Sequence, residues 1–139
     1  MATVIRPVIS TKNKYYIDKH RHYELKHFCL QYPTWKKLHD EALESCISAA
    51  KLERESSTNI PSDITAKYGI RRARYAEYIK LVEDTARKAD EELWYYILRA
   101  VTEGLSFPYL KTMMEIPCGK DMYYDRYRKF FWLLSEIRD

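Results

Sequence analysis

The sequence predicts an all-α protein of five or six helices, and two observations lead to this prediction. The 139 residues include only three glycines and five prolines, so the chain has few of the residues that a multi-stranded sheet needs for its turns. Apolar residues also recur at three- and four-residue steps along much of the chain, which is the spacing of one helix face. A hydrophobic content of 46% with 32% charged residues is typical of a folded chain.

The helices can be placed by their periodicity and by the residues that start and stop them. Tyr32-Pro33 should end the first helix, because the residue before proline avoids helical angles, and Thr34 can cap the second. Asp90 can cap the fourth, and Gly104 can end it. The expected ranges are 12–31, 35–55, 63–88, 90–104, 106–115 and 120–137.

The domain organisation follows from one polar stretch in the middle of the chain. Residues 57–62 read as a linker between a basic N-terminal helical segment, 1–56, and a helical domain, 63–139. In the helix that follows the linker, apolar periodicity marks a set of candidate buried positions. They are Ile64, Ile70, Ala73, Ala76, Ile79, Val82 and Ala86.

The C-terminal third predicts a helix-turn-helix. Ser106 is a candidate N-cap, and Pro108 falls in the first turn, where its missing N–H has no consequence. A turn that contains Pro117 and Gly119 precedes the longer helix. The apolar face of that helix comprises Tyr123, Tyr127, Phe130, Phe131, Leu134 and Ile137.

These residues resemble the helix-turn-helix of sigma-factor region 4. The likeness rests on Gly104-Leu105-Ser106, the apolar Leu110, the turn Ile116-Pro117-Cys118-Gly119 and the following arginine-rich helix. The whole chain resembles the small phage and prophage transcriptional regulators of the RinA and ArpU type, most closely over residues 78–138. The resemblance implies sequence-specific binding to double-stranded DNA and activation of late or packaging genes in the bacterial cytoplasm. It also makes host RNA polymerase a candidate partner and leaves a homodimer open.

In this interpretation the long C-terminal helix enters the major groove of DNA. Lys120, Tyr124 and Arg128 are the candidates for base or groove contacts. Lys111, Arg126 and Lys129 are the candidates for phosphate contacts.

The charge distribution adds a second basic region. Residues 1–39 contain eight Lys and Arg against two Asp and Glu, whereas residues 106–139 have a net charge of only +1. The N-terminal segment therefore supports phosphate binding, with a solvated charged helix as the alternative. Arg71, Arg72 and Arg74 leave the same two interpretations open.

Other functions receive little support from the sequence. His20, His22, His27 and His39 cluster near Cys29, but without the ligand spacing of a structural zinc site, so we expect neither a metal nor a cofactor. No phosphate-binding glycine loop or nucleophile elbow occurs, so we expect no enzyme. Cys118 could have a lowered pKa at a helix N-terminus. The three cysteines and the lack of an apolar span indicate free thiols in the cytoplasm and no membrane association.

Two alternatives to a transcription regulator remain open at this stage. One is a phage DNA-packaging or assembly protein that binds DNA without regulating transcription. The other is a helical protein-interaction module whose helix-turn-helix is purely structural.

Overall fold

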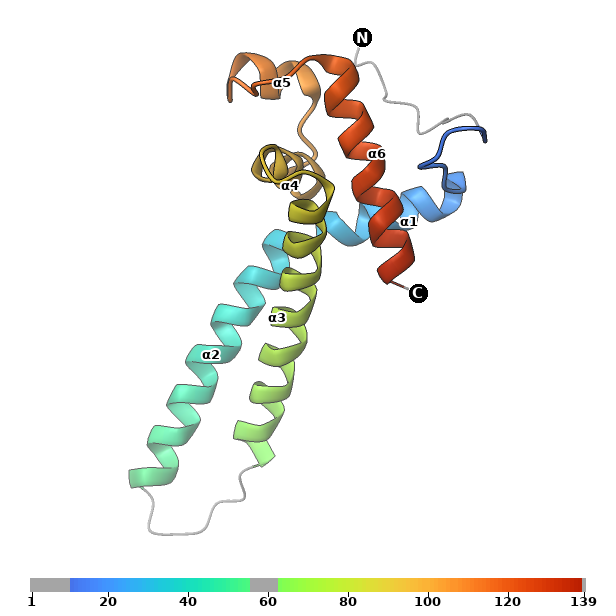
Figure 1. Cartoon of the computed structure of the whole chain (residues 1–139). Helices are drawn as coiled ribbons and strands as arrows, with labels where there is room; N and C mark the ends of the chain where they lie inside the picture. Colours follow the sequence, from blue (N-terminus) through green and yellow to red (C-terminus); the bar gives the residue numbers. More distant parts are fainter. Residues whose placement is uncertain (1–10, 56–62, 139) are drawn as a thin grey trace. The chain divides into compact units, whose positions relative to one another are not determined.

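The chain folds into helices, as the sequence predicts (Figure 1). The computed structural model describes residues 11–55 and 63–138, and no strand occurs within these ranges. The predicted linker at 57–62 lies outside them. The helices are α1 (Lys19–Leu30), α2 (Tyr32–Glu55), α3 (Asp63–Ala89), α4 (Trp94–Glu103), α5 (Phe107–Thr112) and α6 (Lys120–Ile137).

The chain divides into two compact units whose boundaries are not at the predicted linker. One unit consists of Met1–Gln31 together with Val82–Asp139, and the other is Tyr32–Leu81. The division therefore falls just before α2 and within α3. Among the described residues, the first unit brings 11–31 together with the C-terminal helices, which the sequence did not indicate.

The first two helices begin at other residues than the sequence predicts. The helix expected from Lys12 begins at Lys19, because the carboxylate of Asp18 accepts a hydrogen bond from the backbone N–H of His20 and caps α1. The helix expected from Trp35 begins at Tyr32, which places Pro33 in the first turn. The break predicted at Tyr32-Pro33 therefore occurs at Gln31, whose N–H returns to the end of α1.

The later elements follow the sequence more closely, except that α4 begins at Trp94 and not directly after Asp90, and α5 ends at Thr112 and not at Glu115. α3 runs through Gly69 without a break. The Asp90 carboxylate accepts hydrogen bonds from the N–H groups of Glu92 and Leu93, both at 2.8 Å, and caps the turn before α4. Gly104 ends α4 in the left-handed conformation, with φ of 70°. α6 spans the predicted residues, although no side chain caps its start.

The core of the first unit is formed where α1, α4 and α6 meet. α1 packs against α4 and α6, and α4 also packs against α5 and α6 (Figure 1). Tyr123, Phe130, Phe131 and Leu134 of α6 are buried, as predicted, whereas the predicted core residue Ile137 is 47% exposed. Ile137 lies in the last turn of α6.

The second unit is a hairpin of α2 and residues 63–81 of α3. The rings of Trp35 and Tyr78, with centroids 5.2 Å apart, join the two helices. Tyr68, Arg72, Tyr75 and Ile79 are half-buried at steps of three and four residues.

Three predicted core positions of α3 are wrong. Ile70 is 62% exposed, and Ala73 and Ala76 are also exposed. Apolar spacing marked a second side of the helix, but a two-helix hairpin provides only one neighbour, so the residues turned away from α2 stay in contact with solvent.

Candidate nucleic-acid interface

The helix-turn-helix is built from α5, the connection Met113–Gly119 and α6. The Ser106 hydroxyl accepts a hydrogen bond from the N–H of Tyr109 and caps α5. Glu115 has a positive φ of 54°, the conformation in which a left-handed residue ends a helix. Its neighbour Ile116 is 1% exposed and donates its N–H to the carbonyl of Leu110 at 3.0 Å. The buried Ile116 thus anchors the connection beneath α5.

Aromatic rings hold the start of α6 against α5. The ring of Phe107 lies 5.3 Å from that of Tyr123 and 6.2 Å from that of Tyr124, measured between centroids. Tyr123 continues the contact to Tyr127, at 5.9 Å. Because these rings fix the rotation of α6 about its axis, they also determine which side chains it exposes.

The predicted groove residues share one side of α6. Lys120, Tyr124 and Arg128 follow at four-residue steps, so they form a row along the first half of the helix. Lys120 is exposed, and Tyr124 and Arg128 are half-exposed. We call these three residues the basic row.

The predicted phosphate residues are distributed differently. Lys111 is exposed on α5 and donates from Nζ to the carbonyl of Cys118 at 3.3 Å. Lys129 is half-exposed and directly follows Arg128, so it lies about 100° further round α6, in line with Asp121 and Asp125. Within residues 11–55 and 63–138, no carboxylate forms an ion pair with either lysine.

Arg126, in contrast, is already held by two carboxylates. Its Nε donates to Oδ2 of Asp90 at 2.9 Å, and its Nη1 lies 2.6 Å from Oδ2 of Asp125. Burial alone would raise the pKa of Asp90, but hydrogen bonds from Leu93, Arg126 and Glu92 lower it below the ordinary value. This ion pair joins α6 to the turn before α4, which makes Arg126 a structural residue.

Two acidic residues beside the basic row were absent from the sequence-based site. Asp121 and Asp125 each follow a member of the row, so they lie about 100° further round the helix. Both would repel phosphate groups but can accept hydrogen bonds from the amino group of cytosine. Helical spacing could have predicted that Asp121 and Asp125 lie on this surface, because it determines their positions on α6 in the same way as those of the basic row.

A short part of the N-terminal segment lies beside the second half of α6. The ring of Tyr15 is 5.8 Å from that of Trp132, and the Lys14 ammonium lies 4.9 Å from the centre of the Tyr15 ring. The Asn13 side chain accepts the N–H of Tyr15 at 2.8 Å and turns the backbone there. No pattern in the sequence predicts the contact between Tyr15 and Trp132.

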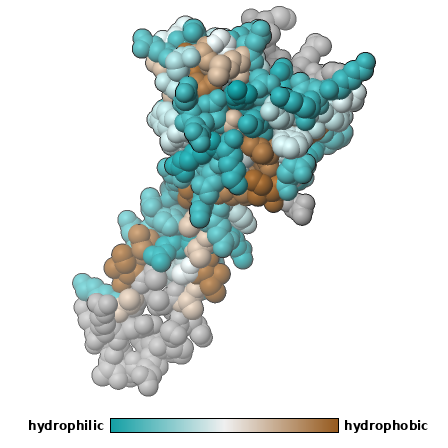
Figure 2. Space-filling view, in the orientation of Figure 1, coloured by the Kyte–Doolittle hydropathy of each residue, from teal (hydrophilic) through white to brown (hydrophobic). Residues whose placement is uncertain are grey.

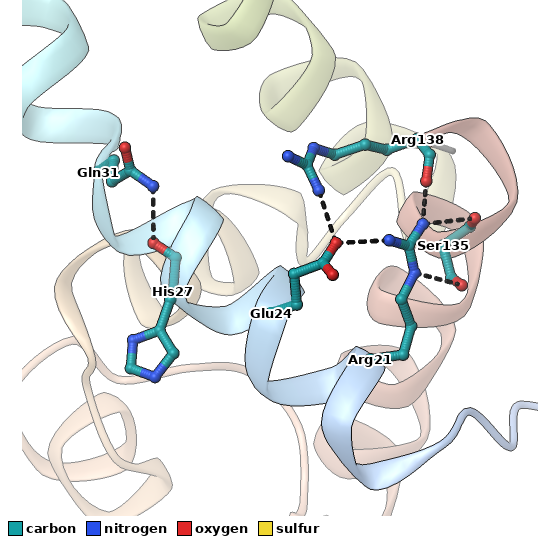
Figure 3. Close-up of polar contacts among 6 residues, drawn as sticks. All are labelled: Arg21, Glu24, His27, Gln31, Ser135 and Arg138. Carbon is teal, nitrogen blue, oxygen red and sulfur yellow. Dashed lines mark hydrogen bonds and ion pairs between the residues drawn. The ribbon is translucent and has the colours of Figure 1, made fainter.

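Arg21 of the N-terminal segment is held by contacts within the fold (Figure 3). Its Nε donates to the Ser135 hydroxyl at 3.3 Å, and its Nη2 donates to the carbonyls of Ser135 and Arg138. Glu24 pairs with both arginines, at 2.6 Å from Arg21 and 3.0 Å from Arg138. This network fastens α1 to the end of α6, so Arg21 is not free for a phosphate.

The structure provides no activated thiol in the connection of the helix-turn-helix. Burial raises the pKa of Cys118, and nearby Lys111 only partly offsets the effect. The lowering that a helix N-terminus can cause is therefore not the dominant effect on the pKa of Cys118.

Comparisons with known proteins give no family assignment. No protein-family model matches the chain, and neither a curated protein nor a solved structure is similar to it. In the part of the chain that the structure describes, no helix is long and apolar enough to cross a membrane. Nor do three or more potential metal ligands gather anywhere among the described residues.

Proposed function

We propose that this chain binds double-stranded DNA sequence-specifically and regulates transcription, as a regulator of the phage or prophage type. The observation that supports this function best is the basic row of Lys120, Tyr124 and Arg128 on the first half of α6. Recognition helices of helix-turn-helix proteins contact base edges from this part of the helix. The resemblance to sigma-factor region 4 also implies that α6 is the helix that contacts base edges.

The basic row offers the chemistry that base recognition needs. Arg128 can donate two hydrogen bonds to a guanine edge, a contact that discriminates by about 1–3 kcal/mol. Lys120 adds a mobile ammonium at the start of the helix, and the Tyr124 hydroxyl can contact a base edge or a phosphate. Asp121 and Asp125 would favour cytosine next to them.

Phosphate contacts are assigned to cations outside the basic row. Lys129 directly follows Arg128 on α6, and Lys111 of α5 reaches the connection before α6. Lys14 extends the surface through the contact between Tyr15 and Trp132. In this proposal Arg126 orients α6 and does not bind a phosphate. Since residues 106–139 carry a net charge of only +1, one copy would bind weakly, so a second copy or contact with host RNA polymerase would have to contribute.

The test begins with selection of bound duplexes from a random DNA pool. If the protein is a sequence-specific regulator, the selected duplexes should be enriched in a defined sequence motif. Lys14→Ala should then weaken binding to all duplexes about equally and reduce the salt slope by about one unit, because a single phosphate contact is lost. Recovery of random sequences despite measurable affinity would contradict sequence-specific recognition.

Two further functions would give other results. A packaging or assembly protein would bind DNA without preferring a promoter of its own genome. A protein-interaction module would bind neither the selected nor the random duplexes but would keep its partner when Arg128 and Lys129 are replaced by Glu. The exposed isoleucines of the hairpin are the observation that favours an added protein partner.

A further inference from the structure

One segment of the hairpin, residues 66–80 of α3, carries the excess positive charge of the whole chain. This segment contains five Lys and Arg against one Glu, a net charge of +4, and the whole chain also has a net charge of +4. The rest of the chain is therefore neutral overall. The helix-turn-helix is much less charged than this segment, because residues 106–139 have a net charge of only +1.

Three of these cations share one side of α3. Lys67, Arg71 and Arg74 follow at steps of four and three residues, and all three are exposed. We call these three residues the α3 cations. Lys80 is also exposed, but it lies at least about 120° round the helix from each of them. Arg72 is half-buried and belongs to the side of α3 that contains the half-buried residues.

The α3 cations are not neutralised by the described chain. Within residues 11–55 and 63–138, none of the three forms an ion pair with a carboxylate, although the exposed Glu77 follows Arg74 by three residues. The Arg71 guanidinium lies 5.9 Å from the centre of the Tyr68 ring, a cation–π contact that leaves its N–H donors without a carboxylate acceptor. This side of α3 is therefore available to an anionic partner.

The α3 cations match the phosphate backbone of duplex DNA in length and in chemistry. Lys67 and Arg74 are seven residues apart, which is about 10 Å along the helix axis. One strand of B-DNA presents a phosphate about every 3.4 Å along its axis, so about three phosphates occupy this length. Each arginine can donate two parallel hydrogen bonds to a phosphate, and Lys67 adds a point charge.

An acidic protein surface matches the α3 cations less well. The centre of a protein interface is depleted in charged residues and enriched in aromatic ones, whereas all three of these positions are cations. Figure 2 shows the apolar surface of the hairpin as separate patches within a largely hydrophilic surface. A contact that depends mainly on charge is typical of binding to a nucleic-acid backbone.

We propose that the α3 cations bind phosphate groups of double-stranded DNA, as a contact separate from base recognition by α6. The inference rests on the proposed function only in taking duplex DNA as the partner, and it does not require a base contact from α6. Phosphate contacts carry no sequence information, so the α3 cations increase the affinity for all duplexes equally. They supply the positive charge that the helix-turn-helix lacks.

The experiment measures the affinity of the full-length protein for the selected duplex and for a random-sequence duplex at several salt concentrations. The α3 triple variant, Lys67→Gln/Arg71→Gln/Arg74→Gln, removes three positive charges and keeps residues that favour a helix. The salt slope should decrease by about 2.7, from about 0.9 for each lost phosphate contact, and the affinity should fall at least about tenfold for both duplexes. The ratio of the two affinities should stay at the wild-type value.

The matched control removes the same charge from other parts of the hairpin. Lys37, Lys51 and Lys80 are all exposed, the first two on α2 and the third on another side of α3. The variant Lys37→Gln/Lys51→Gln/Lys80→Gln should change the salt slope by less than about one unit, because no phosphate contact is assigned to these lysines. Circular dichroism confirms that both triple variants keep the helical content of the wild type.

The possible results separate this inference from the proposed function. Equal salt slopes for the two triple variants would overturn the inference, because net charge alone would then account for the effect. A wild-type slope in the α3 triple variant would also overturn it, while preference for the selected duplex would leave the proposed function standing. Random duplexes bound through the α3 cations without any sequence preference would contradict only the sequence-specific regulator.

Two further results concern the partner itself. If the α3 triple variant lost as much affinity for poly-glutamate as for the random duplex, the α3 cations would be assigned to an acidic protein and the inference would be overturned. A wild type that binds no duplex would overturn both the inference and the proposed function.

Discussion

The Arg126 guanidinium of α6 and the Asp90 carboxylate before α4 lie 2.9 Å apart and form a partly buried ion pair. The Arg126 side chain is 31% exposed and that of Asp90 11%. Through this pair the turn that starts α4 determines the orientation of α6, because Asp90 also accepts two backbone N–H groups from that turn.

Loss of this ion pair should affect stability and not the number of DNA phosphate contacts. Arg126→Ala is expected to lower the free energy of unfolding by about 1 kcal/mol, because the pair is only partly shielded from water. Urea unfolding measures this change. The salt slope of DNA binding should stay at its wild-type value, whereas Lys129→Ala should reduce the slope with little change in stability. A slope reduced by Arg126→Ala would show that Arg126 contacts a phosphate after all.

Protonation of His22 should destabilise the first unit in mild acid. His22 is 6% exposed and packs against Phe131, with ring centroids 4.7 Å apart. Burial, with a smaller effect from Lys26, lowers its pKa from 6.5 to about 4. As the pH falls, the unfolded chain therefore binds this proton before the folded chain does. The contribution of His22 to the free energy of unfolding is fully present above pH 6.5 and is lost progressively towards pH 4. The loss is no more than about 3 kcal/mol.

The measurement is the free energy of unfolding as a function of pH. His22→Gln should flatten the curve between pH 6.5 and 4, and the exposed His20→Gln should keep the wild-type slope. The same slope in all three proteins would contradict the assignment to His22.

The Tyr123 hydroxyl should be dispensable for folding. Tyr123 is fully buried, and its hydroxyl has no hydrogen-bond partner among the described residues. An unsatisfied buried polar group costs about 1–3 kcal/mol, so Tyr123→Phe should leave thermal stability unchanged or raise it by about 1 kcal/mol. A clear fall in the midpoint of thermal unfolding would mean that the hydroxyl has a partner.

The connection between α5 and α6 stores backbone strain at Glu115. A residue with a side chain in the left-handed region costs about 1–2 kcal/mol, which glycine avoids. Glu115→Gly should therefore raise the free energy of unfolding by about 1 kcal/mol. Glu115→Ala removes the same charge but keeps the strain, so it should give no comparable gain. If the alanine variant gained as much as the glycine variant, the effect would come from charge.

The sequence was informative where a few neighbouring residues determine the structure. Ser106, Gly104 and the apolar spacing of α6 placed the ends of the C-terminal helices, because caps and periodicity act within one or two turns. The sequence could not show that Arg126 meets Asp90 or that Arg21 meets Ser135, since those partners are 36 and 114 residues apart. Periodicity also marked Ile70 and Ala73 as apolar without showing whether another element would cover them.

The same limit applies to the candidate site. Spacing alone predicted that Lys120, Tyr124 and Arg128 share one side of a helix, and α6 has this arrangement. Tertiary contacts determine which cations are available to contact DNA. They pair Arg126 with Asp90, and they bring Lys14 close to α6 through Tyr15. The same spacing places Asp121 and Asp125 beside the basic row, although selection by positive charge alone does not include them.

The most direct test of DNA recognition by α6 is the affinity of the double variant Lys120→Glu/Arg128→Glu for the selected duplex. Lys37→Glu on α2, an exposed lysine outside the proposed interface, is the control. We predict that the double variant loses at least about thirtyfold in affinity, from two lost contacts of roughly 1–3 kcal/mol each, while the control stays near the wild-type value. Wild-type affinity in a folded double variant would contradict the proposal that this side of α6 reads DNA.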